Sequence, residues 1–132
     1  MPIKQLRNLA TRRQTQMGLA ASNMRFLSLT ARKSDLEFRG QQTNQQRMLI
    51  AANTEQISED MAALLRTGTI DPDTNPEYLA LVADLEALHA DDRILEMELD
   101  NIDTQHNTVQ TEIDAVKKVI DKNIDMTFKT FA

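Results

Sequence analysis

Apolar residues in the second half of the chain recur at alternating steps of four and three residues. This spacing holds for more than five heptads and is typical of the seam of a coiled coil. Asp92 and His106 interrupt the series, and we interpret His106 as a polar residue that sets the register of the packed helices. The predicted seam consists of Leu81, Leu85, Leu88, Asp92, Leu95, Leu99, Ile102, His106, Val109, Ile113, Val116 and Ile120.

The spacing of apolar residues changes after Ile113. Ile113 and Ile124 are eleven residues apart, and so are Ile120 and Phe131. A period of eleven relaxes or reverses a left-handed supercoil. We therefore expect the C-terminal end to pack differently from the middle of this helix.

The first half of the chain has a weaker pattern, in which half of the members are small or polar. A second stripe of Ile50, Ile57 and Leu64 stands nearer the middle of the chain. We predict a helix over residues 17–66, with a possible bend at Gly40, and a basic arm or short helix over residues 1–16. The main stripe consists of Met17, Ala20, Met24, Leu27, Ala31, Ser34, Phe38, Gln41, Gln45, Met48, Ala52 and Glu55.

The segment TGTIDPDTNPEY contains one Gly and two of the three prolines of the chain, so it interrupts any helix. Thr74 and Glu77 have the spacing of a capping box, with Pro76 in the first helical turn. We predict a turn over residues 67–76 and a helix over residues 77–131.

These elements predict an all-α fold: one extended unit over residues 1–132 that forms a long, coiled-coil-like antiparallel hairpin with an additional N-terminal helical segment or arm. The alternative is a three-helix monomer in which residues 1–34 fold back onto the other two helices.

A lone hairpin leaves many apolar residues without cover, because each helix offers only one seam to its partner. We expect further copies or another helical protein to cover them. The residues left over are Leu19, Phe26, Leu29, Leu36, Leu79, Val82, Ile94, Met97, Val119 and Phe128.

Small residues let helices approach closely, and Met and Phe supply deformable contact area. Small residues accompany Met and Phe in the N-terminal stretch from Met17 to Ala31, and Phe128 and Phe131 lie near the other end of the chain. We interpret both ends as contact surfaces. The predicted assembly contacts are Met17, Gly18, Leu19, Ala21, Met24, Phe26, Leu27, Phe38, Ile120, Ile124, Phe128 and Phe131.

The net charge of −5 conceals a strong asymmetry along the chain. Residues 1–34 carry seven basic residues and no acid, whereas residues 67–106 carry eleven acids and one base. Such asymmetry favours contact between the basic segment of one copy and the acidic segment of another. The predicted electrostatic contacts are Arg12, Arg13, Arg25, Arg32, Lys33, Asp84, Asp91 and Asp92.

Catalytic and cofactor chemistry has little support in the sequence. The chain has no Cys and no Gly-rich phosphate loop, and the stretch DPDTNPEYLALV lacks the Gly and the final Glu of a calcium loop. EALH and DTQH each place a carboxylate and a His on one helical face, but both lie on the same predicted helix, whereas di-iron bundles need two helices. We expect no enzyme activity, no metal and no cofactor.

Three functions remain open: a structural subunit that self-assembles into a filament or tube, a coiled-coil adaptor or secretion-chaperone-like module for one helical client, and a nucleic-acid-associated protein. We expect a homo-oligomer or polymer rather than a nucleic-acid or membrane-surface partner, since Phe26 is the only aromatic residue in the basic segment. No membrane span or cleavable signal is evident, which favours a cytoplasmic protein or one exported by another route.

The stretch GLAASNMRFLSLTARKSDLEFRGQQTNQQR resembles the N-terminal signature of short bacterial helical proteins, and VKKVIDKNIDMTFKTF is similar to their endings. This resemblance implies no particular activity. The general arrangement also resembles that of axial subunits of flagellar and type III secretion systems, without the Asn-rich motif of flagellar rod and hook proteins. That likeness implies a polymerising subunit with helical ends.

Overall fold

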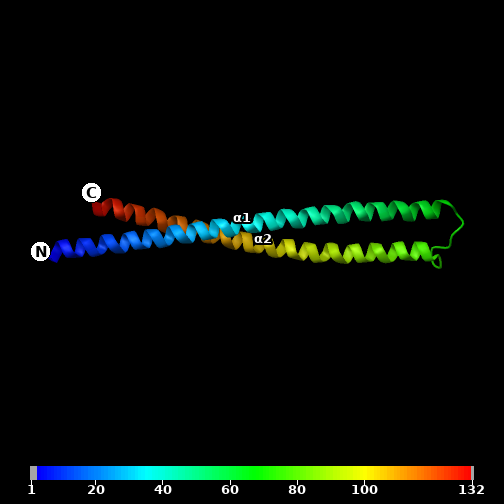
Figure 1. The fold of residues 1–132 in the computed structure, drawn as a ribbon, viewed down its shortest axis with the longest axis horizontal. Coiled ribbons are helices and arrows are strands. Elements are labelled where there is room, and N and C mark those ends of the chain that lie inside the picture. Colours follow the sequence, from blue (N-terminus) through cyan, green and yellow to red (C-terminus); the bar gives the residue numbers. More distant parts are fainter. Residues whose placement is uncertain (1–2, 132) are drawn as a thin grey trace. The chain divides into compact units, whose positions relative to one another are not determined.

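The structure of the chain is a computed structural model that describes residues 3–131, without the side chains of residues 11, 15, 16, 130 and 131. Over these residues it contains two helices, α1 (Ile3–Arg66) and α2 (Pro76–Phe131), joined by a loop over residues 67–75 (Figure 1). The helices pair antiparallel, and the predicted all-α helical hairpin is confirmed.

Helix α1 has no break between Ile3 and Arg66. Residues 3–16 are its first turns and do not form a separate arm or short helix, and the helix continues through Gly40. This continuity also excludes the three-helix monomer, because residues 3–34 belong to the same helix as residues 35–66. The physical reason is that no proline interrupts this stretch.

The chain divides into two compact units, and each unit contains a segment of both helices. Unit 1 comprises Met1–Glu37 and Thr104–Ala132, and unit 2 comprises Phe38–Asp103. The buried apolar residues of unit 1 are Leu29, Leu36, Val109, Ile113 and Val116. In unit 2, Ile102 is buried.

The predicted seam of α2 is confirmed, since every member from Leu81 to Ile120 is buried or half-buried. In unit 1 the heptad spacing continues beyond Ile120 through Asn123 and Thr127, which are half-buried. Ile124, by contrast, is 46% exposed, so the expected change to an eleven-residue period is wrong there. The side chain of Phe131 lies outside the described residues.

The main stripe of α1, from Met17 to Glu55, was expected from its spacing to pack against α2, and this expectation is wrong. Met17 and Met24 are each 72% exposed, and Leu27, Phe38 and Met48 are exposed as well. Leu29 and Leu36, which we expected to remain uncovered, are buried instead. The buried or half-buried series is Ser22, Phe26, Leu29, Lys33 and Leu36 in unit 1, and Gly40, Thr43, Arg47, Ile50, Thr54, Ile57, Met61 and Leu64 in unit 2.

This seam is the backward continuation of the second stripe, because Thr43, Leu36 and Leu29 precede Ile50 at steps of seven. Both stripes of α1 have the same period, so periodicity cannot choose between them. The choice is made by fit to α2. In unit 2 the seam of α1 brings Arg47 to Asp92, and a Cβ added at Gly40 would lie 3.7 Å from Ile102 Cγ2.

The loop ends α1 and starts α2 through its own hydrogen bonds. Gly68 has a φ of 65°, and its N–H donates to the carbonyl of Leu65 at 3.2 Å, which closes the end of α1. The N-cap of α2 is Asn75, whose Oδ1 accepts from the N–H of Tyr78 at 3.0 Å. The predicted cap at Thr74 is therefore one residue too early, and Pro76 is the first helical residue.

Candidate functional site

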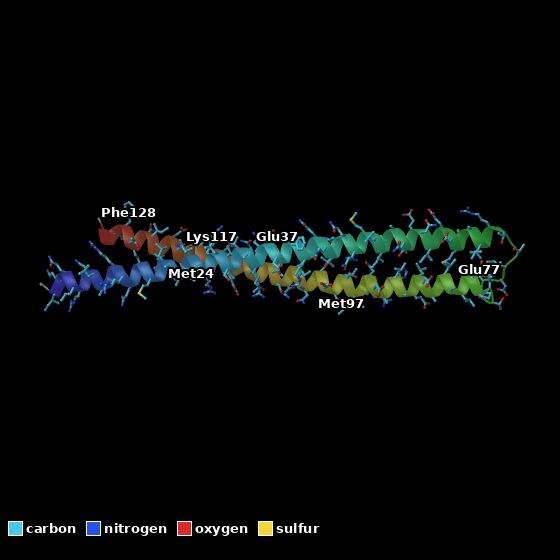
Figure 2. All side chains as sticks on the ribbon, in the orientation of Figure 1. Met24, Glu37, Glu77, Met97, Lys117 and Phe128 are labelled. Atoms are coloured by element: carbon cyan, nitrogen blue, oxygen red, sulfur yellow. The ribbon has the colours of Figure 1, made fainter. Side chains whose placement is uncertain are left out.

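The candidate site consists of exposed apolar and charged surfaces, and its first part lies on α1 in unit 1. The exposed residues Met17, Ala20, Met24, Leu27 and Ala31 form what we call the outer stripe. They occupy the heptad positions on the far side of α1 from its seam, where a two-helix coiled coil is normally charged. Met24 is labelled in Figure 2.

The remaining predicted assembly contacts of unit 1 lie in several places. Ala21 is exposed, whereas Gly18, Leu19, Phe26 and Ile120 are half-buried between the two helices. Phe128 is 76% exposed on α2 (Figure 2). Phe38, 58% exposed, belongs to unit 2.

The ring of Phe26 is engaged within its own chain, because Lys117 Nζ lies 5.8 Å from the ring centroid. This is a cation–π contact within unit 1. Phe26 therefore supports the pairing of α1 with α2 in addition to any contact with a further helix.

Two hollows on one flank of unit 2 form what we call the acidic groove. Their volumes are about 400 and 410 Å³. Each hollow combines apolar side chains from both helices with one carboxylate. The first is lined by Gln46, Leu49, Ile50, Asp91, Ile94 and Leu95, and the second by Asn53, Gln56, Ile57, Asp84, Ala87 and Leu88.

The two hollows repeat with the heptad. Each α1 residue of the first hollow is followed seven residues later by its counterpart in the second, and each α2 residue is preceded by its counterpart by seven. At a rise of 1.5 Å per residue the repeat is about 10 Å. Two turns of a regular α-helix therefore match the spacing of the two hollows.

The outer side of α2 in unit 2 continues the apolar surface beside the groove. Ala80, Ala83, Ala87, Ala90, Ile94 and Met97 follow one another at steps of three and four, and all are exposed. Ile94 and Met97 are 62% and 72% exposed, as expected for residues without a seam partner (Figure 2 labels Met97).

A column of acids borders this surface at steps of seven residues: Glu77, Asp84, Asp91 and Glu98, all exposed. Sequence reasoning selected Asp84 and Asp91 and missed Glu77 and Glu98, although the seven-residue spacing identifies all four. Among the described residues, no hydrogen bond or ion pair occupies Asp84 or Asp91.

Of the predicted basic contacts, Arg13, Arg25 and Arg32 are exposed on α1 in unit 1, and Arg12 and Lys33 are half-buried. Lys33 occupies a seam position. Arg25 and Arg32 are one heptad apart, and within the described part of the chain neither has an ion-pair partner. Their spacing equals that of Asp84 and Asp91.

Asp92 differs from the other predicted acidic contacts because Arg47 of its own chain holds it. Arg47 Nε and Nη2 donate to Asp92 Oδ1 and Oδ2 at 2.9 and 3.2 Å. The hydrogen bond from Arg47 holds the pKa of Asp92 below its ordinary value, although burial opposes this shift. The same bond raises the pKa of Arg47. Asp92 and Arg47 thus form an ion pair between α1 and α2 at the seam of unit 2.

His106 lies on the seam of unit 1, half-buried, with Nε2 3.0 Å from Glu37 Oε1. This contact between α1 and α2 is compatible with the expected role of His106 in setting register. His106 is also the His of the DTQH motif, so Nε2 of that motif is engaged by Glu37. Among the described residues, no group of three or more His, Cys, Asp or Glu side chains is arranged to hold a metal ion.

The described helices contain no stretch that is both long enough and apolar enough to cross a membrane. Chemically, the surfaces above offer apolar area and charges for binding another helix.

The chain was compared with known proteins in three ways. No family model matches it, and neither the curated proteins nor the solved structures include a match.

Proposed function

We propose that this protein is a structural subunit that self-assembles through its helices, into a filament or tube. The observation that carries the proposal is the exposure of the outer stripe, where Met17, Met24 and Leu27 are 72, 72 and 66% exposed on the side of α1 that its hairpin partner does not cover. In globular proteins, exposed apolar side chains that lie next to one another mark a contact site.

The charge pattern supports contact between copies. The segment that contains the outer stripe, residues 1–34, carries seven basic residues and no acid, whereas residues 67–106 carry eleven acids and one base. Two copies can therefore bring opposite charges together, and added salt should weaken their attraction.

Light scattering coupled to size-exclusion chromatography, with negative-stain electron microscopy, tests this function across a salt series. We expect large, elongated assemblies at low salt that shrink as salt rises. A monomer at all salt and protein concentrations would contradict the proposal. A small oligomer of fixed size would instead favour the coiled-coil adaptor.

A further inference from the structure

We propose that the acidic groove of unit 2 is the docking site for the outer stripe of a second copy, with Arg25 and Arg32 of that copy pairing with Asp84 and Asp91. This inference rests on the proposed function, because it names the surfaces through which the copies would meet. It assigns a donor and an acceptor face to the same chain.

The first argument is the apolar fit. The volumes of the two hollows are about 400 and 410 Å³. The apolar lining of the first hollow is Leu49, Ile50, Ile94 and Leu95, and that of the second is Ile57, Ala87 and Leu88. Met24 and Ala31 of the outer stripe are one heptad apart, as are the two hollows. Each is followed directly by one of the two arginines, so one register serves both the apolar and the charged contacts. Unbranched methionine side chains adapt to irregular hollows.

The second argument is the charge fit. Asp84 and Asp91 stand in the hollows with no partner among the described residues, and Arg25 and Arg32 on α1 are likewise unpaired within the part of the chain described. Both pairs are spaced by seven residues, so one placement of the helix satisfies both. A partner helix of negative charge would be repelled from the same groove.

The third argument is the small size of the side chains beside the groove. Ala80, Ala83, Ala87 and Ala90 are exposed along α2 and allow the backbone of another helix to come close. The flat, small side chains therefore do not obstruct a helix that enters the groove.

Because groove and stripe are different surfaces, each copy both offers and receives a contact. Such a heterologous contact either closes into a ring or continues as an open chain. The second outcome is the geometry that a filament needs.

A charge exchange in the full-length chain tests the site. The variant Asp84→Lys/Asp91→Lys reverses the groove, and Arg25→Glu/Arg32→Glu reverses the stripe. We expect each variant alone to raise the protein concentration needed for half-assembly by at least about ten-fold, because like charges then face each other. An equal mixture of the two variants should restore assembly, since each then meets an opposite charge on the other.

Glu55→Lys/Glu59→Lys is the matched control, because it makes the same change in net charge on exposed residues of α1 away from the groove. It should leave assembly near the wild-type level. Circular dichroism verifies that every variant keeps its helices. The proposal is overturned if the groove variant assembles like wild type, or if the mixture fails to recover while both variants remain helical.

A second measurement is independent of charge. The chain has no cysteine, so Met24→Cys in one copy can be mixed with Leu49→Cys or Gln56→Cys in another, one variant for each hollow. We expect an intermolecular disulfide with at least one of the two, because a disulfide needs close approach of the two Cβ atoms. Met24→Cys with Glu59→Cys is the control pair. Assembly without preferential cross-linking at either hollow contradicts this site but leaves self-assembly standing, whereas a strictly monomeric wild type contradicts both.

Discussion

Individual seam residues show how the two helices recognise each other. Leu36 is 2% exposed and Thr43 4%, yet Thr43 is polar. Its hydroxyl donates to the carbonyl of Arg39 at 2.9 Å, so burial leaves its donor satisfied. Buried Leu and self-satisfied Thr thus serve the same seam, and residue polarity alone does not identify it.

Replacing Leu36 with Ala should lower the free energy of unfolding by about 2–5 kcal/mol, because the truncation removes buried contacts and leaves a cavity. Met24→Ala should change it by less than about 0.5 kcal/mol, since Met24 is largely exposed. Urea unfolding followed by circular dichroism measures both. A larger loss for Met24→Ala, at a protein concentration where the chain is monomeric, would mean that the seam of α1 is on the other face.

The pair of Arg47 and Asp92 makes stability depend on pH. Because the pKa of Asp92 is lowered in the folded protein, its ion pair stabilises the fold above the unfolded pKa of about 4, and this contribution is lost as the pH falls through the folded pKa. We expect Asp92→Asn to lower the unfolding midpoint at pH 7 and to approach wild type in acid. Glu59→Gln, at an exposed acid of α1 away from the groove, is the control and should show no such convergence.

At the scale of the element, the ends of the helices depend on single residues of the loop. Asn75 caps α2 through the N–H of Tyr78, and Asp71 Oδ1 accepts from the N–H of Asp73 at 3.0 Å inside the loop. These local bonds explain why α1 stops and α2 begins within ten residues of each other.

Two glycines should respond to alanine in opposite directions. Gly40→Ala should stabilise the protein by about 0.5–1 kcal/mol, because its Cβ would make an ordinary 3.7 Å contact and alanine favours helix. Gly68→Ala should destabilise it by about 1 kcal/mol, since a φ of 65° strains any residue with a Cβ. Thermal melts at one protein concentration compare the pair. Loss of stability in Gly40→Ala would show that the α1 seam at this point has no room for a methyl group.

At the scale of the whole molecule, exposed apolar side chains occur in both units. Met24 and Phe128 in unit 1 and Met97 in unit 2 are each more than 70% exposed. A single chain thus leaves surface that further helices can cover, and this is the physical basis for the assembly we propose.

Phe128→Ala should weaken assembly without weakening the fold. The aromatic ring is 76% exposed in the single chain, so its removal costs little there, whereas a buried aromatic ring at an interface often dominates binding. We expect the concentration for half-assembly to rise about ten-fold or more by light scattering. Leu65→Ala, at a 44% exposed residue outside the predicted contacts, is the control. Equal effects of both variants would remove Phe128 from the assembly contacts.

Local patterns in the sequence were sufficient for α2 and its seam, for residues 17–66 of α1 and for the loop between the helices, because heptad spacing, proline and glycine act over a few residues. They did not show that residues 3–16, expected as a separate arm or short helix, continue into α1. The opposite charges of the two segments were likewise readable. The start of α2 was misplaced by one residue, since Thr74 and Asn75 are both acceptable caps and the backbone of the loop selects between them.

Only the tertiary structure decided which face of α1 is buried. The stripe with Met17 and Met24 is the more apolar toward the N-terminus, but the stripe with Leu29 and Leu36 is the one that matches α2 within each unit. Pairing Arg47 with Asp92 and Gly40 with Ile102 depends on residues more than forty positions apart. Periodicity reports the existence of two faces on one helix, whereas the complementarity of distant side chains determines which of them the partner covers.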